Sequence, residues 1–239
     1  MTRQTTGNNL AIITARGGSK RIPRKNIRPF CGQPIISYSI RAALTSGVFD
    51  EVMVSTDDEE IARTAQAFGA KIPFLRSADT AGDYASTDDV IAEVLASYEQ
   101  QGRRFDRFCC IYPTAPFVTA ERLRQAMELL DTVESVMPVV PFSYPPQRGL
   151  ILENGLIRRK YPEFLTARSQ DLEKMYHDCG QFYACRTDAF LRGNTTDVED
   201  LAPLILSELE VQDIDTPEDW EIAELKFSRL RQQIQEGHI

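Results

Sequence analysis

Short apolar runs alternate with longer amphipathic stretches along the first 140 residues of the chain. The apolar runs predict buried strands, which we expect at residues 10–14, 51–55, 72–75, 108–112 and 135–140. The stretches between them repeat their apolar positions every three or four residues and predict helices at 34–46, 56–68, 88–101 and 120–130. Strands that alternate with helices in this way predict an α/β fold of the three-layer, Rossmann-like kind, with a mostly parallel sheet.

The alternation breaks at Pro141. From there to about Tyr176 the chain contains four prolines, an Asn154-Gly155 pair typical of a tight hairpin, and apolar residues that a linker would not need. We therefore expect a single domain over 1–239 with a small subdomain inserted at about 141–178. The sheet is expected to resume at 180–185 and to end with a strand at 211–215, before a helix that opens at Pro217. The apolar stripe of that helix predicts packing and consists of Trp220, Ala223, Phe227, Leu230 and Ile234.

The loop after the first strand concentrates positive charge. Between residues 16 and 28 there is no acidic residue, and the six basic residues are Arg16, Lys20, Arg21, Arg24, Lys25 and Arg28. Because the whole chain carries a formal net charge of -8, this loop predicts a small polyanionic ligand and no nucleic-acid partner. Gly17 and Gly18 would let backbone N–H groups approach a phosphate, at the strand end where open α/β sheets bind ligands. The alternative is a solvated basic turn before a helix.

Several other classes of site find no support in the residues. The pattern G-x-x-x-x-G-K-[ST] is missing, and no G-x-G-x-x-G follows the first strand. The five cysteines, of which Cys109 and Cys110 share one apolar run, form neither a disulfide framework nor a zinc pattern. No apolar run approaches the roughly 18 residues that span a bilayer, and residues 1–9 lack a signal-peptide core. We therefore expect a cytoplasmic protein without a membrane partner.

Asp213 and Asp215 form the second informative pattern. In a strand, residues i and i+2 point to the same face, so both carboxylates would converge on one cation. Mg²⁺ prefers oxygen ligands and is commonly held by one or two carboxylates together with substrate phosphates. The alternative is that Asp215, which precedes Thr216-Pro217, caps the C-terminal helix. Alternation likewise places Gln181 and Tyr183 on one face, either as hydrogen-bonding groups for a sugar or as an ordinary polar face.

Residues 15–26 read A-R-G-G-S-K-R-I-P-R-K-N and resemble the first motif of the CMP-sialic acid synthetase family, the cytidylyltransferases that activate nine-carbon acidic sugars. Arg21, where many members carry glycine, makes the motif most similar to the pseudaminic acid branch, although Thr14 replaces the expected proline. Residues 112–116, Y-P-T-A-P, resemble a motif that is usually Q-P-T-S-P, and Tyr112 replaces a glutamine that contacts the sugar in sialic acid enzymes. Residues 176–183 resemble the family's N-G-x-x-Y segment, with Cys179 in place of asparagine. The resemblance thus extends over nearly the whole chain.

The resemblance implies a three-layer nucleotidyltransferase fold, a homodimer joined through the insert, and roles for individual residues. The implied catalytic residues are Arg16, Lys20 and Lys25. Nucleotide binding is implied for Ala15, Arg16, Ser19, Lys25, Asn26, Arg76 and Ser86. Sugar binding is implied for Tyr112, Gln181 and Tyr183, and across the dimer interface for Arg148 and Arg168. The implied ligands of a Mg²⁺ cofactor are Asp213 and Asp215.

The reaction that the resemblance implies is transfer of CMP from CTP to the anomeric hydroxyl of a nine-carbon 2-keto sugar acid, with release of pyrophosphate. Pseudaminic acid is the expected acceptor, because Tyr112 offers an aromatic face where an amide would bind hydroxyl groups. Sialic acid, or an eight-carbon keto acid of the KDO type, is the alternative acceptor. A non-catalytic nucleotide-binding protein on the same fold is the alternative from another functional class.

Overall fold

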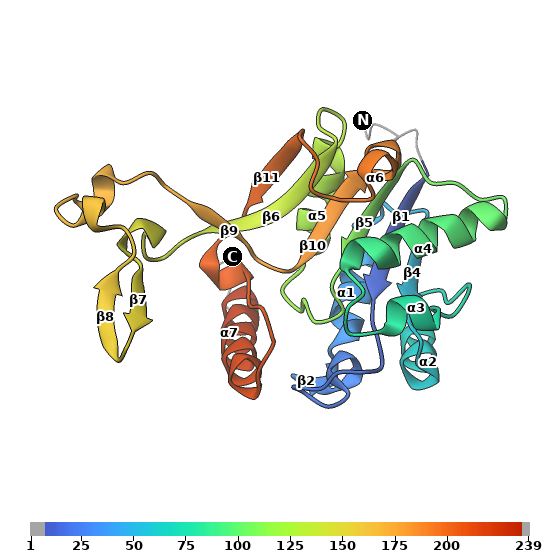
Figure 1. The fold of residues 1–239 in the computed structure, drawn as a ribbon. Coiled ribbons are helices and arrows are strands. Elements are labelled where there is room, and N and C mark those ends of the chain that lie inside the picture. Colours follow the sequence, from blue (N-terminus) through green and yellow to red (C-terminus); the bar gives the residue numbers. More distant parts are fainter. Residues whose placement is uncertain (1–7, 236–239) are drawn as a thin grey trace.

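The computed structural model describes residues 8–235, with side chains to residue 232, and its centre is a seven-stranded sheet (Figure 1). The strand order is β11-β6-β10-β5-β1-β4, and β9 pairs with β6 beside this path. The strands are β1 (Asn9–Thr14), β4 (Glu51–Ser55), β5 (Arg107–Ile111), β6 (Ser135–Pro141), β9 (Tyr176–Asp178), β10 (Phe182–Arg186) and β11 (Leu201–Ile205). β1 is parallel to β4 and β5, and β11 is parallel to β6, whereas β10 is antiparallel to β5 and β6. The predicted mostly parallel sheet in an α/β fold is confirmed.

Helices cover both faces of this sheet, which makes the three layers. One face carries α1 (Ile36–Ser46), α2 (Glu59–Ala67) and α5 (Ala120–Leu129), and the other carries α4 (Thr87–Gln100) and α6 (Thr187–Gly193). The helix boundaries follow local chemistry. Asp58 caps α2 by accepting from the N–H groups of Glu60 and Ile61, and Ser86 caps α4. The short helix α3 (Ala78–Ala81) precedes α4.

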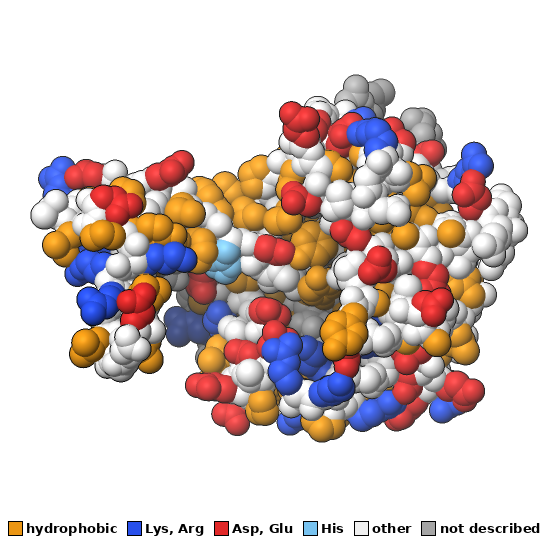
Figure 2. Space-filling model, viewed as in Figure 1, with side chains coloured by type: hydrophobic (Ala, Val, Ile, Leu, Met, Phe, Trp, Pro, Cys, Tyr) orange, Lys and Arg blue, Asp and Glu red, His pale blue; other side chains and the backbone are white. Residues whose placement is uncertain are grey.

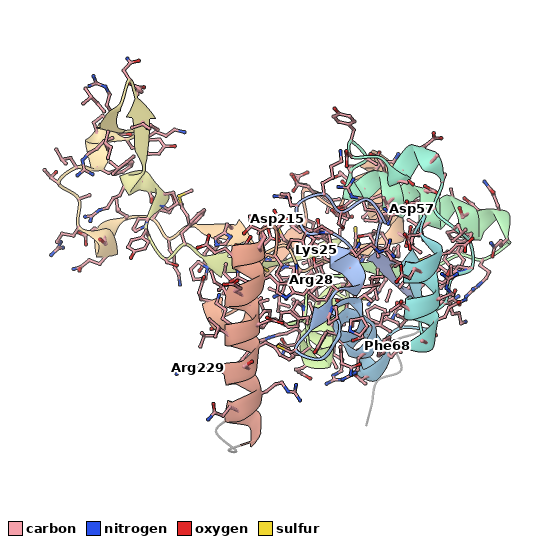
Figure 3. The ribbon with its side chains drawn as sticks, turned by 90° about the horizontal axis from the view of Figure 1, so that it is seen from below. Lys25, Arg28, Asp57, Phe68, Asp215 and Arg229 are labelled. Carbon is pink, nitrogen blue, oxygen red and sulfur yellow. The ribbon has the colours of Figure 1, made fainter. Side chains whose placement is uncertain are left out.

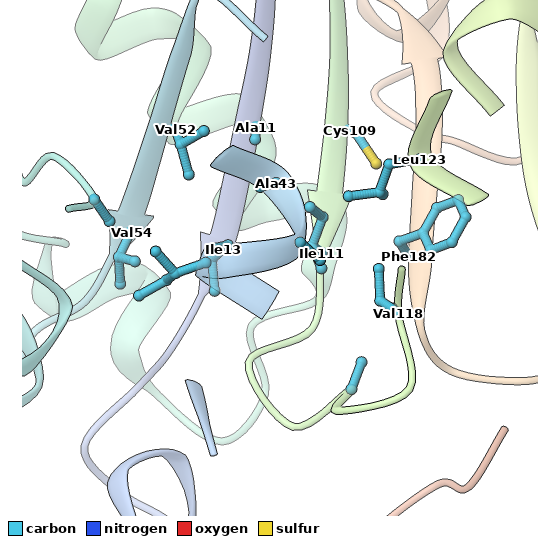
Figure 4. Packing of buried hydrophobic residues seen from close by; sticks show 14 of the residues in the cluster. Ala11, Ile13, Ala43, Val52, Val54, Cys109, Ile111, Val118, Leu123 and Phe182 are labelled. Carbon is cyan, nitrogen blue, oxygen red and sulfur yellow. The ribbon is translucent and has the colours of Figure 1, made fainter. Parts of the chain in front are cut away.

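Two hydrophobic clusters hold the layers together, and neighbouring residues of β5 contribute to both. Cys109 belongs to the cluster under α1 and α5, whereas Cys110 belongs to the cluster under α4 and α6. Figure 4 shows the first cluster, in which Leu123 and Ala43 lie against the strand residues. The two cysteines are therefore small buried residues that point to opposite faces, as the sequence predicts.

The C-terminal helix α7 (Pro217–Gln235) packs on a small hairpin formed by β2 (Pro29–Phe30) and β3 (Gln33–Pro34). The ring of Phe30 meets Trp220 and Phe227 edge to face, with centroid separations of 5.6 and 5.4 Å. The predicted stripe packs at Trp220, Ala223, Phe227 and Leu230, whereas Ile234 lies outside the described side chains. Within residues 8–235, no helix combines the length and the apolar composition needed to cross a membrane.

An arm of residues 142–175 projects from one side of the sheet (Figure 1). The chain leaves the sheet at the end of β6 and returns as β9, where Tyr176 pairs with Pro141, so the predicted insert at 141–178 includes a strand of the sheet. The arm contains a hairpin of β7 (Leu150–Glu153) and β8 (Leu156–Arg159), whose turn residues Asn154 and Gly155 have φ of 50° and 76°. Figure 2 shows hydrophobic side chains exposed along this arm, at the left of the view.

Three predicted elements differ from the structure. Residues 72–75 form no strand, and only Lys71 makes a bridge, to Met53 of β4. Residues 211–215 are extended beside the sheet without pairing, although Val211 and Ile214 are buried. Pro34 does not open α1, which begins at Ile36, because Pro34 belongs to β3. Several elements of the structure were not predicted, namely the hairpin of β2 and β3, the short helix α3, and α6 and β11.

Candidate active site

A cavity of about 340 Å³ opens where β1 and β5 end. Its walls come from the end of β1, the basic loop and the segment after β5, and comprise Thr14, Arg16, Ser19, Lys20, Arg21, Ile22, Lys25, Asn26, Tyr112, Pro113 and Thr114. The motif at residues 15–26 and the motif at residues 112–116 therefore meet in one place, at the carboxyl ends of adjacent parallel strands. This position favours a ligand site over a solvated turn.

Local contacts fix the shape of the basic loop. The amide of Asn26, a buried side chain, donates to the carbonyl of Arg16 at 2.8 Å and ties the two ends of the loop together. The N–H of Gly17 donates to Oδ1 of Asp57 at 2.9 Å, so this N–H is not free to bind phosphate as the sequence suggested. A Cβ on Gly17 would lie 3.0 Å from Asp58, which explains why glycine stands there. Ala15 is fully buried and donates its N–H to Ser55 at 2.9 Å.

The basic side chains of the loop divide into two groups. Arg16, Lys20, Arg21 and Lys25 line the cavity, as do Ser19 and Asn26. Arg24 and Arg28 are outside this lining. Arg24 pairs with Asp58 and Glu60, and Arg28 stacks on Trp220 with its guanidinium carbon 4.8 Å from the ring centroid. The second group therefore anchors the loop, whereas the first is available to an anionic ligand.

Carboxylates from distant parts of the chain pair with the cations of the cavity. Asp83 pairs with Arg16 at 2.7 Å and also with Lys20. Asp215 pairs with Arg21 at 2.9 Å and with Lys25 at 3.4 Å. The Nζ of Lys25 also donates to the carbonyl of Ile214 at 2.7 Å. Figure 3 shows Lys25 beside Asp215, next to the N-terminal end of α7.

The capping alternative for Asp215 is wrong. Thr216 caps α7: its hydroxyl accepts from the N–H of Asp219 at 3.2 Å, and Asp219 accepts from the N–H of Thr216 at 2.8 Å. The side chain of Asp215 is therefore free of the helix and turns to the basic loop. Partial burial and, second, the neighbouring charge of Asp215 raise the pKa of Asp213.

Asp213 and Asp215 offer donors of the kind that magnesium takes. Carboxylates supply the hard oxygen donors that Mg²⁺ prefers, and phosphates and water commonly complete its shell. In residues 8–235 no group of three or more acidic, histidine or cysteine side chains is arranged to hold a metal by itself. A metal at this place would therefore need oxygen ligands from a substrate.

Tyr112 forms one wall of the cavity and is fixed by its neighbours. Its N–H donates to the carbonyl of Gln181 at 2.9 Å, its hydroxyl lies 3.3 Å from that of Thr87, and its ring meets Tyr183 edge to face at 5.8 Å. The hydroxyl of Tyr183 donates to Asp178. Burial raises the pKa values of both tyrosines, and the hydrogen bond to Asp178 adds to the shift of Tyr183. Both hydroxyls therefore stay protonated near neutral pH.

Gln181 is not arranged as the sequence suggested. Its side chain is buried, and its amide donates to the carbonyl of Glu210 at 2.7 Å, so the group holds the backbone near residue 210 and does not face the cavity. Arg148 and Arg168 lie in the arm and are absent from the cavity lining of their own chain. Arg148 donates to the carbonyl of Ala167, and Arg168 pairs with Asp171 at 2.7 Å.

Arg76 and Ser86 also lie outside the cavity lining. Arg76 is buried and donates to the hydroxyl and the carbonyl of Ser55 at 3.0 and 2.8 Å, so it is not an ordinary surface residue. Burial lowers the pKa of its guanidinium. The hydroxyl of Ser86 is occupied with the capping box of α4, in which it accepts from the N–H of Asp89 at 3.1 Å.

Three carboxylates near the site, those of Asp57, Asp83 and Asp178, were not predicted from the sequence. Asp83 lies in a polar stretch without periodicity, and Asp178 precedes a predicted strand. Asp57 stands next to Asp58, which caps α2. The available signal was indirect: a loop with many cations and no acid requires counter-charges from elsewhere unless a ligand supplies them.

Comparison with known proteins identifies the family. The family model described as "Cytidylyltransferase" matches residues 10–182, which include the basic loop and the cavity. The chain belongs to the cytidylyltransferase family. It is therefore a nucleotidyltransferase enzyme, and the family resemblance predicted from the motifs is confirmed.

Relatives of this cytidylyltransferase act on several acidic sugars. It is 43% identical over 222 residues to a pseudaminic acid cytidylyltransferase of Campylobacter jejuni, covering 92% of this chain and 96% of that relative. It is 36% identical to the CMP-N,N'-diacetyllegionaminic acid synthase of Legionella pneumophila, with 94% and 97% coverage. Among solved structures, a CMP:2-keto-3-deoxy-manno-octonic acid synthetase complexed with CTP is similar in fold, with a TM-score of 0.68 and 18% identity over 93% of this chain and 99% of that one.

Proposed function

We propose that this cytidylyltransferase transfers CMP from CTP to the anomeric hydroxyl of pseudaminic acid, a nine-carbon 2-keto sugar acid, and releases pyrophosphate. The observation that carries the proposal is the cavity itself, where Arg16, Lys20, Arg21 and Lys25 converge at the carboxyl end of the sheet. The 43% identity to a pseudaminic acid cytidylyltransferase supports the choice of sugar. The polyanion expected from the basic loop is then the triphosphate of CTP.

In the reaction, the anomeric oxygen of the sugar forms a bond to the α-phosphorus while the bond between that phosphorus and the β-phosphate oxygen breaks. The proton of the hydroxyl leaves to solvent, and the electron pair of the broken bond stays on pyrophosphate. Positioning and charge neutralisation provide most of the rate in such transfers. Arg16, Lys20 and Lys25 would neutralise the triphosphate, and Ser19 and Asn26 lie in the same wall.

Asp213 and Asp215 would hold Mg²⁺, which supplies charge neutralisation and acidifies the attacking hydroxyl when bound. This role is supported by the cap of α7, which is formed by Thr216 and leaves the carboxylate of Asp215 free for other contacts. Lys25 keeps the two aspartates next to the basic loop through its bond to Ile214.

The choice of sugar depends on Tyr112. Its ring and single hydroxyl replace an amide, and a deoxy, di-N-acylated sugar such as pseudaminic acid has fewer hydroxyls and more apolar surface than sialic acid. Cys179 likewise offers no amide where the family's segment has asparagine; it is buried, and its thiol donates to the carbonyl of Pro138 at 3.2 Å.

The arm supports a homodimer. Leu152 and Ile157 pair across the hairpin and are 74% and 70% exposed, which is more apolar surface than a small two-stranded unit can cover by itself. A second copy of this chain would cover both arms in one isologous contact and bring Arg148 and Arg168 toward the partner's cavity. Mixing an Arg16→Ala subunit with an Arg168→Ala subunit should then restore activity, whereas failure to complement would remove the role in trans.

A substrate panel tests the proposed function. Pyrophosphate release is measured on mixing the enzyme with CTP, Mg²⁺ and one of pseudaminic, legionaminic, sialic or eight-carbon keto acid. We expect the highest kcat/KM with pseudaminic acid. A preference for another acid would change the acceptor and keep the reaction, and no release with any of them would overturn the function.

A further inference from the structure

Asp83 pairs with two of the residues assigned to the triphosphate. Its Oδ1 lies 2.7 Å from Nη1 of Arg16, and its Oδ2 pairs with Nζ of Lys20. Hydrogen bonds from Lys20 and then from Arg16 lower the pKa of Asp83, so its carboxylate is ionised at neutral pH. One carboxylate thus spans two cations with one oxygen each, as two oxygens of a phosphate group would.

Residues 82–85, called the strap below, lie between two segments that hydrogen bonds fix to α4, and the strap itself makes few contacts with other elements. Before the strap, Glu93 of α4 accepts from the N–H of Ser77 at 2.7 Å and from the hydroxyl of Thr80. After it, the capping box of Ser86 fixes the start of α4.

Within the described chain, the hydrogen bonds and ion pairs that join the strap itself to other elements are those to Arg16 and Lys20. They are the two pairs of Asp83 and a long contact of 3.4 Å from Arg16 to the carbonyl of Gly82. Tyr84 beside them is fully exposed. The strap is therefore held against the cavity mainly by the charge of Asp83.

We infer that Asp83 is a built-in counter-anion that pairs with Arg16 and Lys20 in place of a phosphate group and is displaced when a polyphosphate binds. The inference rests on the proposed function, because it takes the cavity as the triphosphate site. A phosphate and the Asp83 carboxylate cannot both contact Arg16 and Lys20 at hydrogen-bond distance without repelling each other. Entry of the polyphosphate therefore frees the strap.

Such a competitor lowers the affinity for every polyphosphate, including the product. Without Asp83, two cations would face the bound pyrophosphate with no group ready to replace it, and pyrophosphate would leave more slowly. With Asp83, the return of the strap restores both ion pairs as the product departs. Asp83 thus lowers the affinity for polyphosphates and speeds the dissociation of pyrophosphate.

The opposite role for Asp83 is that of a positioning residue, which would hold Arg16 and Lys20 ready for the ligand. The two roles predict opposite signs for the same substitution. Removing a competitor tightens polyphosphate binding, whereas removing a positioning group weakens it.

Calorimetric titration of inorganic tripolyphosphate and inorganic pyrophosphate at fixed ionic strength tests the inference. Asp83→Asn should bind both anions roughly three- to tenfold more tightly than the wild type, the scale expected for two exposed ion pairs. Asp79→Asn is the matched control: it removes the same charge from α3, and no ion pair or side-chain hydrogen bond joins Asp79 to the described residues. Its affinity should stay within twofold of the wild type.

Limited proteolysis gives a second readout. Tripolyphosphate should speed chymotryptic cleavage after the exposed Tyr84 in the wild type, since binding removes the ion pairs that hold residues 82–85, and should leave the cleavage rate of Asp83→Asn unchanged. Unchanged cleavage in the wild type, equal or weaker binding by Asp83→Asn, or an equal gain in Asp79→Asn would each overturn the inference.

The outcomes for the counter-anion and for the proposed function can be told apart. A wild type that releases pyrophosphate from CTP but shows no gain in Asp83→Asn disproves the counter-anion alone. A wild type that neither binds tripolyphosphate nor turns over CTP disproves both.

Discussion

The ammonium group of Lys25 donates to the carbonyl of Ile214 at 2.7 Å, so a residue of the first motif binds the backbone between the two aspartates of the last. The residues are 189 positions apart in sequence. This bond fixes the distance between the cations that would neutralise the triphosphate and the carboxylates that would hold the metal. Both halves of the site thus depend on one side chain.

We expect Arg16→Ala and Lys25→Ala each to lower kcat/KM for CTP by about 2–4 kcal/mol of transition-state stabilisation, the scale for losing one well-placed donor. Lys25→Ala should also loosen the segment around Ile214 and raise the Mg²⁺ requirement, because its backbone bond is lost. Steady-state kinetics over a range of CTP concentrations measure both effects. Arg104→Ala is the control, since it removes an exposed cation that pairs with Glu99 away from the cavity. Near wild-type values in both test variants would contradict the assignment of the loop.

Asp213→Asn and Asp215→Asn should each raise the Mg²⁺ concentration needed for half-maximal rate at least roughly tenfold, because one oxygen ligand loses its charge. Chelator should abolish turnover of the wild type. Asp197→Asn, which changes an exposed aspartate near α6, should leave the Mg²⁺ requirement as it is. Full activity in excess EDTA would show that the two aspartates serve another purpose.

Replacing Leu152 and Ile157 together by Asp should produce a monomer, because it places charges in the exposed apolar face of the arm. Sedimentation measures the mass, and the KM for the sugar should rise if the partner's arm completes the site. Leu225→Asp is a matched control, since Leu225 is 73% exposed but lies on α7. A wild type that is monomeric at micromolar concentration would rule out the dimer.

Tyr112→Gln should shift the ratio of kcat/KM values from pseudaminic toward sialic acid by at least roughly tenfold, because an amide able to bind hydroxyls replaces an aromatic face. Tyr112→Phe keeps the ring and loses only the hydroxyl, which contacts Thr87 at 3.3 Å, and should keep the wild-type preference. An unchanged ratio in the glutamine variant would move specificity to other residues.

Glu51 should make the free energy of unfolding depend on pH in the acid range. Burial alone would raise its pKa, but hydrogen bonds from Arg103, Lys71 and Tyr98 outweigh burial and hold the pKa at about 2. A carboxylate whose pKa is lowered in the folded protein stabilises the fold at pH values above its pKa in the unfolded chain. This stabilisation is lost as the pH falls from about 4.5 to about 2.

The corresponding variant is Glu51→Gln, which leaves two cations without their buried partner. It should lower the free energy of unfolding by about 3 kcal/mol at pH 7, and the difference should shrink through the same acid range. Urea unfolding at several pH values measures both. A difference that does not change with pH would show that packing, not charge, causes the loss.

Much of the sheet could be predicted because β1, β4 and β5 are buried on both faces and are largely apolar runs. The errors have physical reasons. Residues 211–215 were predicted as a strand, but Val211 and Ile214 are buried by packing, and no strand among the described residues pairs with this segment. β11 was missed because Pro203 interrupts its pattern, and a proline is tolerated there because β11 is the edge strand.

The site was predictable where its residues are contiguous and not where they are dispersed. Residues 15–26 form one loop, so their chemistry is visible in the sequence. Asp83 belongs to no motif and enters the site only through the fold, whereas Asp178 lies within residues 176–183 but carries no role in the motif that this segment resembles. The contact of Gln181 could not be predicted for the same reason. Strand alternation determines the face on which a side chain lies but not its hydrogen-bond partner, which for Gln181 is the carbonyl of Glu210.

The root of the arm makes it separable from the catalytic sheet. Pro141 and Tyr176 are paired neighbours, and the N–H of Phe142 donates to the carbonyl of Met175 at 3.1 Å, so the chain departs and returns at almost the same point. A short turn could therefore replace the whole excursion without breaking a strand, and longer excursions would add little entropic cost. The size and surface of the arm could therefore change at this root while the pairing of the sheet strands stays the same.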